Sequence, residues 1–357
     1  MNDRPRITMV GAGYFAQFQL QGWRDAGAQV VALCDLDADR ASALAQRFDV
    51  PQTFGDTAAM LDATKHDLVD VVLPPQAQPA VVRVAVERGL PVICQKPFGD
   101  DLAQAEAMTA LARSHRSLLV VHENFRFTPW FRECRRLIDT GHLGRVHGIA
   151  FRLRPGDGQG PAAYLDRQPY FQTMPQLLVR ETAVHFIDTF RYLCGEVLAV
   201  TARLRRLNPM IAGEDAGIVI FEFADDCSGL FDGNRLNDFS AADPRRTMGE
   251  LWLEGERGVL RLDGDARLWF KPHHKPEAEH HYAFDPNAAF GGAVTALQAH
   301  VLAHLQHGAV LENSASDYLH NLRVQAAVYR SHESGRRIAM ADFDPRPIPQ
   351  PLTETTP

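Results

Sequence analysis

The hydrophobic pattern of the first third of the chain alternates between short apolar runs and amphipathic stretches. Short apolar runs bounded by glycine, proline or polar residues are typical of strands buried on both faces. We expect strands at Ile7–Val10, Gln29–Cys34, Leu68–Leu73, Leu90–Cys94 and Ser117–Val121. The stretches between them have helical spacing and predict helices near Tyr14–Asp25, Asp39–Phe48, Pro79–Arg88 and Leu102–His115. This alternation predicts βαβ units and a doubly wound, parallel Rossmann sheet in an α/β fold.

The pattern changes after about residue 123. A strand is expected at Arg145–Leu153 and a helix at Leu177–Leu193, and successive strand-like runs with short turns follow from Ala199 to about Phe284. Runs of this kind predict a large, mostly antiparallel, open sheet. Two helices, near Gly292–His307 and Ala315–Arg330, follow the sheet. We therefore divide the chain into a nucleotide-binding domain (1–123), a substrate-binding and oligomerisation α/β domain (124–341) and a proline-rich tail (342–357), which we expect to be extended.

Length and composition narrow the class of protein further. The chain has 357 residues, enough for two domains, with 45% hydrophobic and 23% charged residues and a net charge of −7. An acidic balance argues against nucleic acid as a partner, and no apolar run is long enough for a membrane span. Five scattered cysteines without a CxxC pair, and a start without a signal-peptide pattern, predict reduced thiols in a cytoplasmic protein.

A glycine-rich motif directly follows the first expected strand. In Gly11-Ala12-Gly13-Tyr14-Phe15-Ala16, Gly11 permits a tight turn, Gly13 permits close approach of a pyrophosphate, and Ala16 permits close packing of the next helix on the sheet. Asp35 ends the second strand, where a carboxylate binds ribose hydroxyls and repels a 2′-phosphate. The motif and Asp35 predict a dinucleotide site with NAD as the cofactor and NADP less favoured. NADP is not excluded, because Arg40 lies in the same region.

Two further turns are expected at the carboxyl ends of sheet strands, where open α/β sheets bind ligands. Leu73-Pro74-Pro75 follows the third long strand, and Gln95-Lys96-Pro97 follows the next. A lysine at the end of an apolar strand is able to stabilise an alkoxide or hold a substrate hydroxyl, although a surface lysine extending past the strand end is the structural alternative.

The Leu177–Leu193 helix carries the residues best suited to proton transfer. Residues four apart share a helix face, so Glu181 and His185 are expected to project together, with Asp188 one turn further along. A carboxylate beside an imidazole suits proton transfer near neutral pH, although a buried histidine held by a carboxylate for structural reasons has the same pattern.

In combination these motifs resemble the Gfo/Idh/MocA family, the glucose–fructose oxidoreductase and inositol dehydrogenase-like enzymes. The resemblance runs from about Ile7 to Ile338 and also includes Asn124-Phe125-Arg126-Phe127 and Gly141-His142-Leu143-Gly144. It implies oxidation or reduction of a small sugar, polyol or cyclic alcohol with NAD(P), in a homodimer or homotetramer built through the C-terminal sheet. The cofactor site it implies comprises Gly11, Gly13, Tyr14, Phe15, Ala16, Asp35, Leu36, Leu73, Pro74, Pro75, Gln78, Gln95, Lys96 and Asn124. The substrate site it implies comprises Lys96, Asn124, Arg126, Arg154, Glu181 and His185.

The resemblance also implies a mechanism. His185 matches the family's catalytic histidine and would remove the hydroxyl proton as hydride leaves the same carbon. Lys96 would stabilise charge on that oxygen, and Glu181 would orient the imidazole or hold a neighbouring hydroxyl. Gln95 and Glu181 replace a glutamate and an aspartate of the family pattern, and Met174-Pro175-Gln176 replaces a glycine cluster. The Glu-x-x-x-His form is similar to aldose 1-dehydrogenases, some of which act on branched pentoses.

Two other functions remain compatible with the sequence. One is NAD-dependent glycoside hydrolysis, in which NAD is reduced transiently and recovered. The other is a non-catalytic, nucleotide-responsive regulator, against which the presence of Lys96 and His185 argues. His273-His274 and His280-His281 flank a polar loop, and we expect no metal site there because adjacent histidines cannot easily share one tetrahedral ion.

Overall fold

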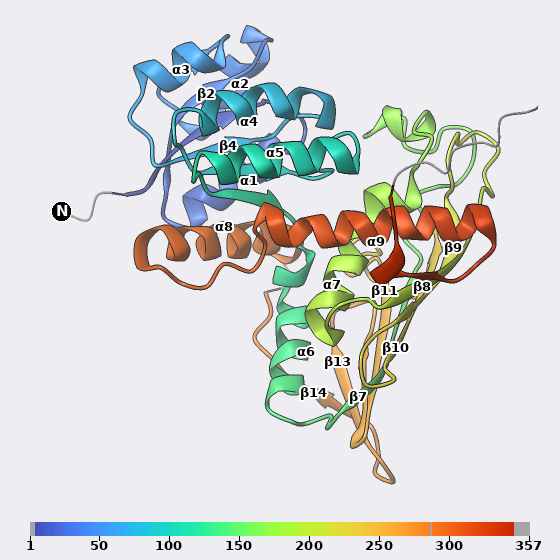
Figure 1. Ribbon diagram of the computed structural model, residues 1–357. Coiled ribbons are helices and arrows are strands. Elements are labelled where there is room, and N and C mark those ends of the chain that lie inside the picture. The colour runs from blue at the N-terminus through green and yellow to red at the C-terminus, as the bar shows by residue number, and fades with distance from the viewer. Residues whose placement is uncertain (1–3, 286–287, 346–357) are drawn as a thin grey trace, which may run out of the picture.

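The first sheet is fully parallel and has the strand order β3-β2-β1-β4-β5-β6. In the computed structural model, which describes residues 4–285 and 288–345, helices cover both faces of this sheet (Figure 1). The order reverses between β1 and β4, so a crevice is expected at the carboxyl ends of these strands. The strands are β1 (Arg6–Val10), β2 (Gln29–Cys34), β3 (Thr53–Phe54), β4 (Leu68–Val71), β5 (Val92–Gln95) and β6 (Leu119–His122). The helices are α1 (Ala16–Asp25), α2 (Ala38–Phe48), α3 (Thr57–Ala63), α4 (Gln78–Val86) and α5 (Leu102–Ser114).

The Rossmann arrangement predicted from the apolar runs is confirmed. Each expected strand and helix of this region is present, with ends displaced by one or two residues. The short elements β3 and α3 were not predicted. β3 has only two residues, which carry no readable periodicity. The strands β4, β5 and β6 are buried throughout, although β6 is the last strand of the sheet, and their sequences therefore read as continuous rather than alternating patterns.

The second sheet has nine strands in the order β14-β13-β12-β11-β7-β10-β9-β8-β15. Neighbouring strands are antiparallel except β7 and β10, which are parallel, so the prediction of a mostly antiparallel sheet is confirmed. The strands are β7 (Val146–Leu153), β8 (Ala199–Arg205), β9 (Ala216–Glu222), β10 (Ser228–Asn234), β11 (Gly249–Gly255), β12 (Gly258–Leu262), β13 (Leu268–Pro272), β14 (Ala278–His280) and β15 (Ile338–Ala339).

One face of this sheet is covered by helices and the other is open. Figure 1 shows α6 (Pro129–Asp139) and α7 (Val184–Cys194) on one side of the sheet, and side chains of α6, α7 and α9 (Ala315–Ser334) share a hydrophobic core with the inward residues of the strands. The outward residues of the central strands include large apolar side chains that are 40–46% exposed: Ile218, Ile220, Leu230 and Trp252.

The last two long helices return to the first sheet. Helix α8 (Ala289–His307) packs against α1, where Leu297 and Val301 join a core with Trp23. Helix α9 extends from α5 across to β8 (Figure 1). The predicted second domain therefore also completes the covering of the first. Residues 346–357 of the predicted proline-rich tail lie outside the described residues.

Candidate active site

The turn between β1 and α1 has the geometry that the glycine motif predicts. Gly11 has φ +107°, and a side chain there would collide with the carbonyl oxygen of Val72. At Gly13, by contrast, no atom lies within 4 Å of the place where a Cβ would be. Gly11 is therefore required by the fold. Gly13 leaves the surface open in front of the N-terminus of α1, where backbone N–H groups favour phosphate.

Asp35 lies beside the same turn and has a fixed orientation. Its Oδ2 accepts a hydrogen bond from the backbone N–H of Ala12 at 2.7 Å, and its Oδ1 accepts one from the backbone N–H of Asp37 at 2.9 Å. Leu36, next in the chain, is 96% exposed. A fixed carboxylate next to an open glycine turn fits the ribose and pyrophosphate of a dinucleotide such as NAD, held by Gly11, Gly13, Ala16 and Asp35.

Gln78 joins the two turns that follow β4 and β5. Its side chain is fully buried, and its Oε1 accepts from the N–H of Gly99. Its Nε2 shares its two N–H donors among the carbonyl oxygens of Leu73, Gln95 and Pro97, at 3.1, 2.9 and 3.0 Å. This corrects our expectation of a direct cofactor contact: Gln78 lies behind the turns and holds them together. Of the residues expected in the first of these turns, Leu73 and Pro75 are half-buried and Pro74 is exposed.

Lys96 and Glu181 form a nearly buried ion pair. The ammonium Nζ is 2.6 Å from Oε1 of Glu181 and 3.0 Å from its backbone oxygen, and the two side chains are 10% and 9% exposed. The backbone is π-helical at Leu178–Ala183 and becomes α-helical at Val184. The predicted helix is therefore present, but its first turn is wider than α-helical spacing assumes, and π-helical turns of this kind occur frequently at functional sites.

His185 is paired with Glu123, which the sequence analysis did not identify. Its Nδ1 lies 2.7 and 2.8 Å from the two carboxylate oxygens of Glu123, and the ring of Phe125 stacks on the imidazole at 3.8 Å. The expectation that Glu181 orients the imidazole is wrong, because Glu181 binds Lys96. Burial alone would raise the pKa of Glu123, but the adjacent His185, the N–H of Phe125 and the charge of Lys96 lower that pKa below its usual value. The carboxylate is therefore ionised and fixes a proton on Nδ1.

Glu123 was missed because it carries no motif of its own. It immediately follows β6, at the carboxyl end of a buried strand, and this position alone could have signalled it. Sequence periodicity relates Glu181 and His185, which are close in the chain. It cannot relate His185 to a residue 62 positions away.

Two of the expected substrate-binding arginines are occupied within the protein. Arg126 forms two hydrogen bonds with Asp188, of 2.7 and 2.6 Å, and Asn321 donates to the same carboxylate. Arg154 binds Asp232 at 2.5 Å. Neither arginine is among the residues that line the cavity described below, and their contact with substrate stays a prediction.

A cavity of about 390 Å³ brings together the other residues of the predicted substrate site. Its lining includes Lys96, Glu181 and His185 beside Tyr14 and Phe15 of the glycine motif. Gln95, Asn124 and the unpredicted residues His122 and Arg246 line it as well. Burial lowers the pKa of His122 to about 4, so this imidazole is neutral. The cavity therefore joins an expected nicotinamide region to two acid–base pairs.

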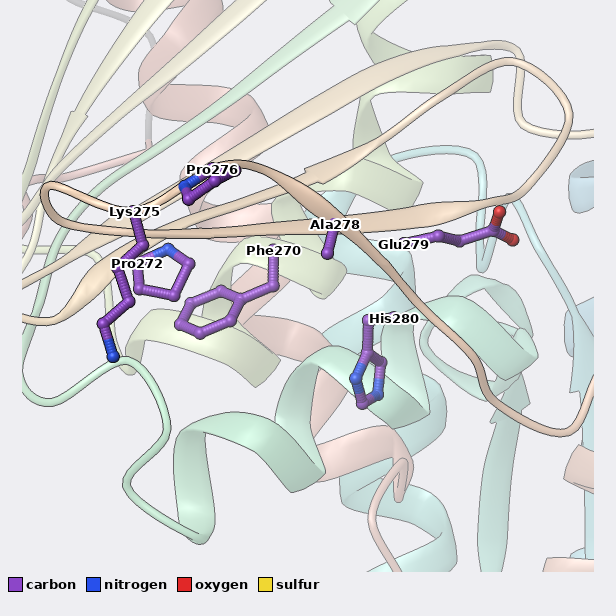
Figure 2. A pocket seen from close by; sticks show the side chains of 7 residues that line it. All are labelled: Phe270, Pro272, Lys275, Pro276, Ala278, Glu279 and His280. Atoms are coloured by element: carbon purple, nitrogen blue, oxygen red, sulfur yellow. The ribbon is translucent and has the colours of Figure 1, made fainter.

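A second hollow, of about 410 Å³, lies on the β13–β14 hairpin (Figure 2). Its lining residues include Phe270, Lys275 and His280, none of which belongs to the predicted site. Nε2 of His280 is bound to Glu133 of α6 at 2.6 Å. We assign this hollow no function.

Comparisons with known proteins place the chain in a family. Residues 5–123 match the model of an oxidoreductase family with an NAD-binding Rossmann fold, and residues 131–261 match the GFO/IDH/MocA C-terminal domain. A D-apiose dehydrogenase of Paraburkholderia graminis is 30% identical over 349 residues, which cover 94% of this chain and 90% of the relative. The chain belongs to the Gfo/Idh/MocA family. It is an NAD-binding oxidoreductase, and the resemblance seen in the sequence is confirmed.

Another relative and two solved structures are also similar to this chain. An inositol 2-dehydrogenase of Saccharopolyspora erythraea is 28% identical over 206 residues, 57% of this chain and 58% of the relative. The structure of an oxidoreductase from Agrobacterium radiobacter in complex with NAD+, L-tartaric acid and magnesium has a TM-score of 0.86 and 26% identity over 95% of this chain and 99% of that one. Levoglucosan dehydrogenase in complex with NADH and levoglucosan has a TM-score of 0.80 and 17% identity, over 95% of this chain and 100% of that one. Among the described residues, no helix is long and apolar enough to cross a membrane.

Proposed function

We propose that this protein is an NAD-dependent sugar dehydrogenase that oxidises the anomeric hydroxyl of an aldopentose, with D-apiose as the first candidate. The observation that carries the proposal is the placement of Lys96, Glu181 and His185 on one cavity beside the glycine motif, with Glu123 buried behind His185. Two D-apiose dehydrogenases, 30% and 27% identical over 94% and 92% of the chain, support the substrate.

His185 is the proposed general base. Because the carboxylate of Glu123 holds the proton of Nδ1, the other ring nitrogen, Nε2, has a free lone pair. Among the described residues, none is hydrogen bonded to Nε2, and His185 lines the cavity. A hydroxyl placed against Nε2 loses its proton to the ring, and the buried negative charge of Glu123 stabilises the imidazolium that forms.

Lys96 is the proposed stabiliser of the substrate oxygen. Its ammonium has three N–H donors, and two of them bind Glu181, which leaves one for a ligand. Positive charge in a nearly buried site strongly favours the oxygen from which the proton has departed. Glu181 fixes the ammonium, and its second carboxylate oxygen is available to a neighbouring hydroxyl of the sugar.

Gly13 and Asp35 would hold the cofactor. Bound there, NAD would supply the acceptor for the hydrogen that the anomeric carbon loses with its bonding electrons. The chain provides the other requirements, namely a base for the hydroxyl proton and a cation for the oxygen. The product of such an oxidation is a lactone.

The test is a screen of NAD reduction by the purified protein. D-apiose, other aldopentoses, hexoses, polyols and inositols are offered with NAD and then NADP, and the product is identified by mass spectrometry. NADH accumulation with lactone or aldonate from an aldose supports the proposal. Cleavage of a glycoside without net NADH would identify the hydrolase instead, and binding of NAD without turnover of any substrate would favour the regulator.

We also propose that the open face of the nine-stranded sheet forms a homodimer interface, alone or within a homotetramer. Ile218 and Ile220 of β9, Leu230 of β10 and Trp252 of β11 form a partly exposed apolar patch on this face, which a second copy would cover. The five free cysteines support our expectation of a reducing, cytoplasmic environment.

A further inference from the structure

A carboxylate lies at the centre of the parallel sheet, where neighbouring positions are apolar. Asp70 is in β4, between β1 and β5, and is fully buried. The indole Nε1–H of Trp23 donates to its Oδ2 at 2.7 Å. Burial raises the pKa of Asp70 to about 7, although the hydrogen bond from Trp23 opposes that shift. None of the steps proposed above uses this group.

Asp70 is connected to the lysine turn by two glutamine side chains. In the amide orientation that gives every atom a partner, the nitrogen of Gln19 donates to Asp70 at 2.5 and 2.8 Å, and its oxygen accepts from Nε2 of Gln95 at 2.8 Å. Oε1 of Gln95 then accepts from the backbone N–H of Lys96 at 2.7 Å. A buried chain of hydrogen bonds therefore runs from Trp23 to the backbone of Lys96.

The direction of this chain of hydrogen bonds is fixed by its two ends. The indole of Trp23 and the backbone N–H of Lys96 are donors that cannot accept. Each amide accepts on the side of Lys96 and donates on the side of Asp70, so the chain requires an acceptor at Asp70. The ionised carboxylate provides it. If Asp70 is protonated, its hydroxyl becomes a third donor beside the N–H groups of Gln19 and Trp23. One of these buried donors is then left without an acceptor.

We propose that Asp70 is a positioning residue for Lys96, and that its ionised carboxylate holds the Lys96 backbone in place through Gln19 and Gln95. This chain of hydrogen bonds also gives a reason for glutamine at position 95. A carboxylate there would accept a hydrogen bond from Lys96 but would not donate one to Gln19. Displacement of the Lys96 backbone moves the ammonium that binds Glu181, so the ionisation of Asp70 reaches the active site.

The surroundings of Asp70 favour this assignment. Helix α1 presents Trp23 and Gln19, and β5 presents the thiol of Cys94, whose pKa burial raises well above its usual value. Among the described residues, no charged side chain forms an ion pair with Asp70. Its ionisation is therefore stabilised by hydrogen bonds alone, and above pH about 7 the carboxylate is ionised and the chain is complete.

Nuclear magnetic resonance tests the coupling directly. The chain contains four tryptophans and four lysines, so protein labelled with nitrogen-15 at these two residue types gives few signals, which Trp23→Phe and Lys96→Arg assign. We expect the Trp23 indole and the Lys96 backbone signals to move with a shared midpoint near pH 7. Gln19→Met should abolish the Lys96 movement and leave the Trp23 movement. Thr8→Val, which alters another buried polar side chain of the same sheet, should leave both.

Two results would overturn the proposal. One is a Lys96 signal that does not move while the Trp23 signal titrates. The other is a Lys96 movement that persists in Gln19→Met, which would assign the movement to a group other than Asp70. Asp70→Asn is a second variant: it should make both signals independent of pH in this range, and a Trp23 signal that still titrates would also overturn the proposal.

A kinetic experiment measures the consequence, which rests on the function proposed above. We expect Gln19→Met to lower kcat about 10- to 100-fold, because small displacements of a positioned group have effects of this size. NAD affinity, measured by binding, should stay within about twofold because the glycine motif and Asp35 are unchanged. Unchanged kcat would refute the positioning role. If the protein oxidises no sugar, the proposed function fails, and the resonance experiment still decides the coupling.

Discussion

Substitution of Glu123 by glutamine tests the proposed base most sharply. Glutamine has nearly the same shape as glutamate, so the cavity and the packing of β6 are retained. The change removes the negative charge 2.7 Å from Nδ1 of His185. It also places an NH2 group at one of two positions that now accept hydrogen bonds, from Phe125 N–H at 3.2 Å and from the hydroxyl of Tyr318 at 3.5 Å.

The expected loss follows from these contacts. A hydrogen bond to a charged group contributes about 1.5–3 kcal/mol and a neutral one about 0.5–1.5 kcal/mol, so the lost charge alone costs the imidazolium about 1–1.5 kcal/mol. That corresponds to about a 5- to 13-fold lower kcat. If the amide nitrogen turns toward Nδ1, the ring proton moves to Nε2 and the base is blocked, and the loss approaches the ~100- to 10,000-fold expected when general-base help is removed.

The assay is steady-state NAD reduction with the best sugar from the screen, for Glu123→Gln, His185→Ala and the double variant. Because Glu123 acts through His185, the double variant should be no slower than His185→Ala alone. NAD affinity should be unchanged in all three, since the residues that hold the dinucleotide lie elsewhere. The His185–Glu123 assignment would be refuted if the losses in kcat of the two single variants multiplied in the double variant. It would also be refuted if Glu123→Gln were as fast as the parent.

Three further predictions follow from the structure. Gly13→Ala should keep the melting temperature of the parent and weaken NAD binding by about tenfold. Gly11→Ala should lower the melting temperature, because Gly11 is tightly packed and Gly13 is not. Equal effects of the two changes on stability would contradict the turn geometry. Asp35→Ser should raise kcat/KM with NADP relative to NAD by removing the charge that repels a 2′-phosphate, and an unchanged cofactor ratio would show that Asp35 does not set it. Ile220→Asp should convert the proposed oligomer to a smaller species in size-exclusion chromatography, and an unaltered elution volume would exclude the open face of β9 as the interface.

Much of the fold could be predicted from the sequence because it depends on local pattern. Strands buried on both faces leave apolar runs, and the antiparallel sheet leaves closely spaced turns, so both sheets were predictable. The glycine motif and Asp35 also need only their neighbours in the chain. Lys96 and His185 were identified for the same reason, since each lies in a recognisable local motif.

Only the tertiary structure decided which carboxylate is paired with Lys96 and which with His185. Helical spacing suggested Glu181 as the partner of His185, but Glu181 binds Lys96 across 85 residues and Glu123 binds His185 across 62. The burial of Arg126 and Arg154 in ion pairs, and the chain from Asp70 to Lys96, are likewise products of packing between distant segments. The physical reason is common to all three: hydrogen bonds join whatever side chains the fold brings within about 3 Å, and sequence periodicity describes only one element at a time.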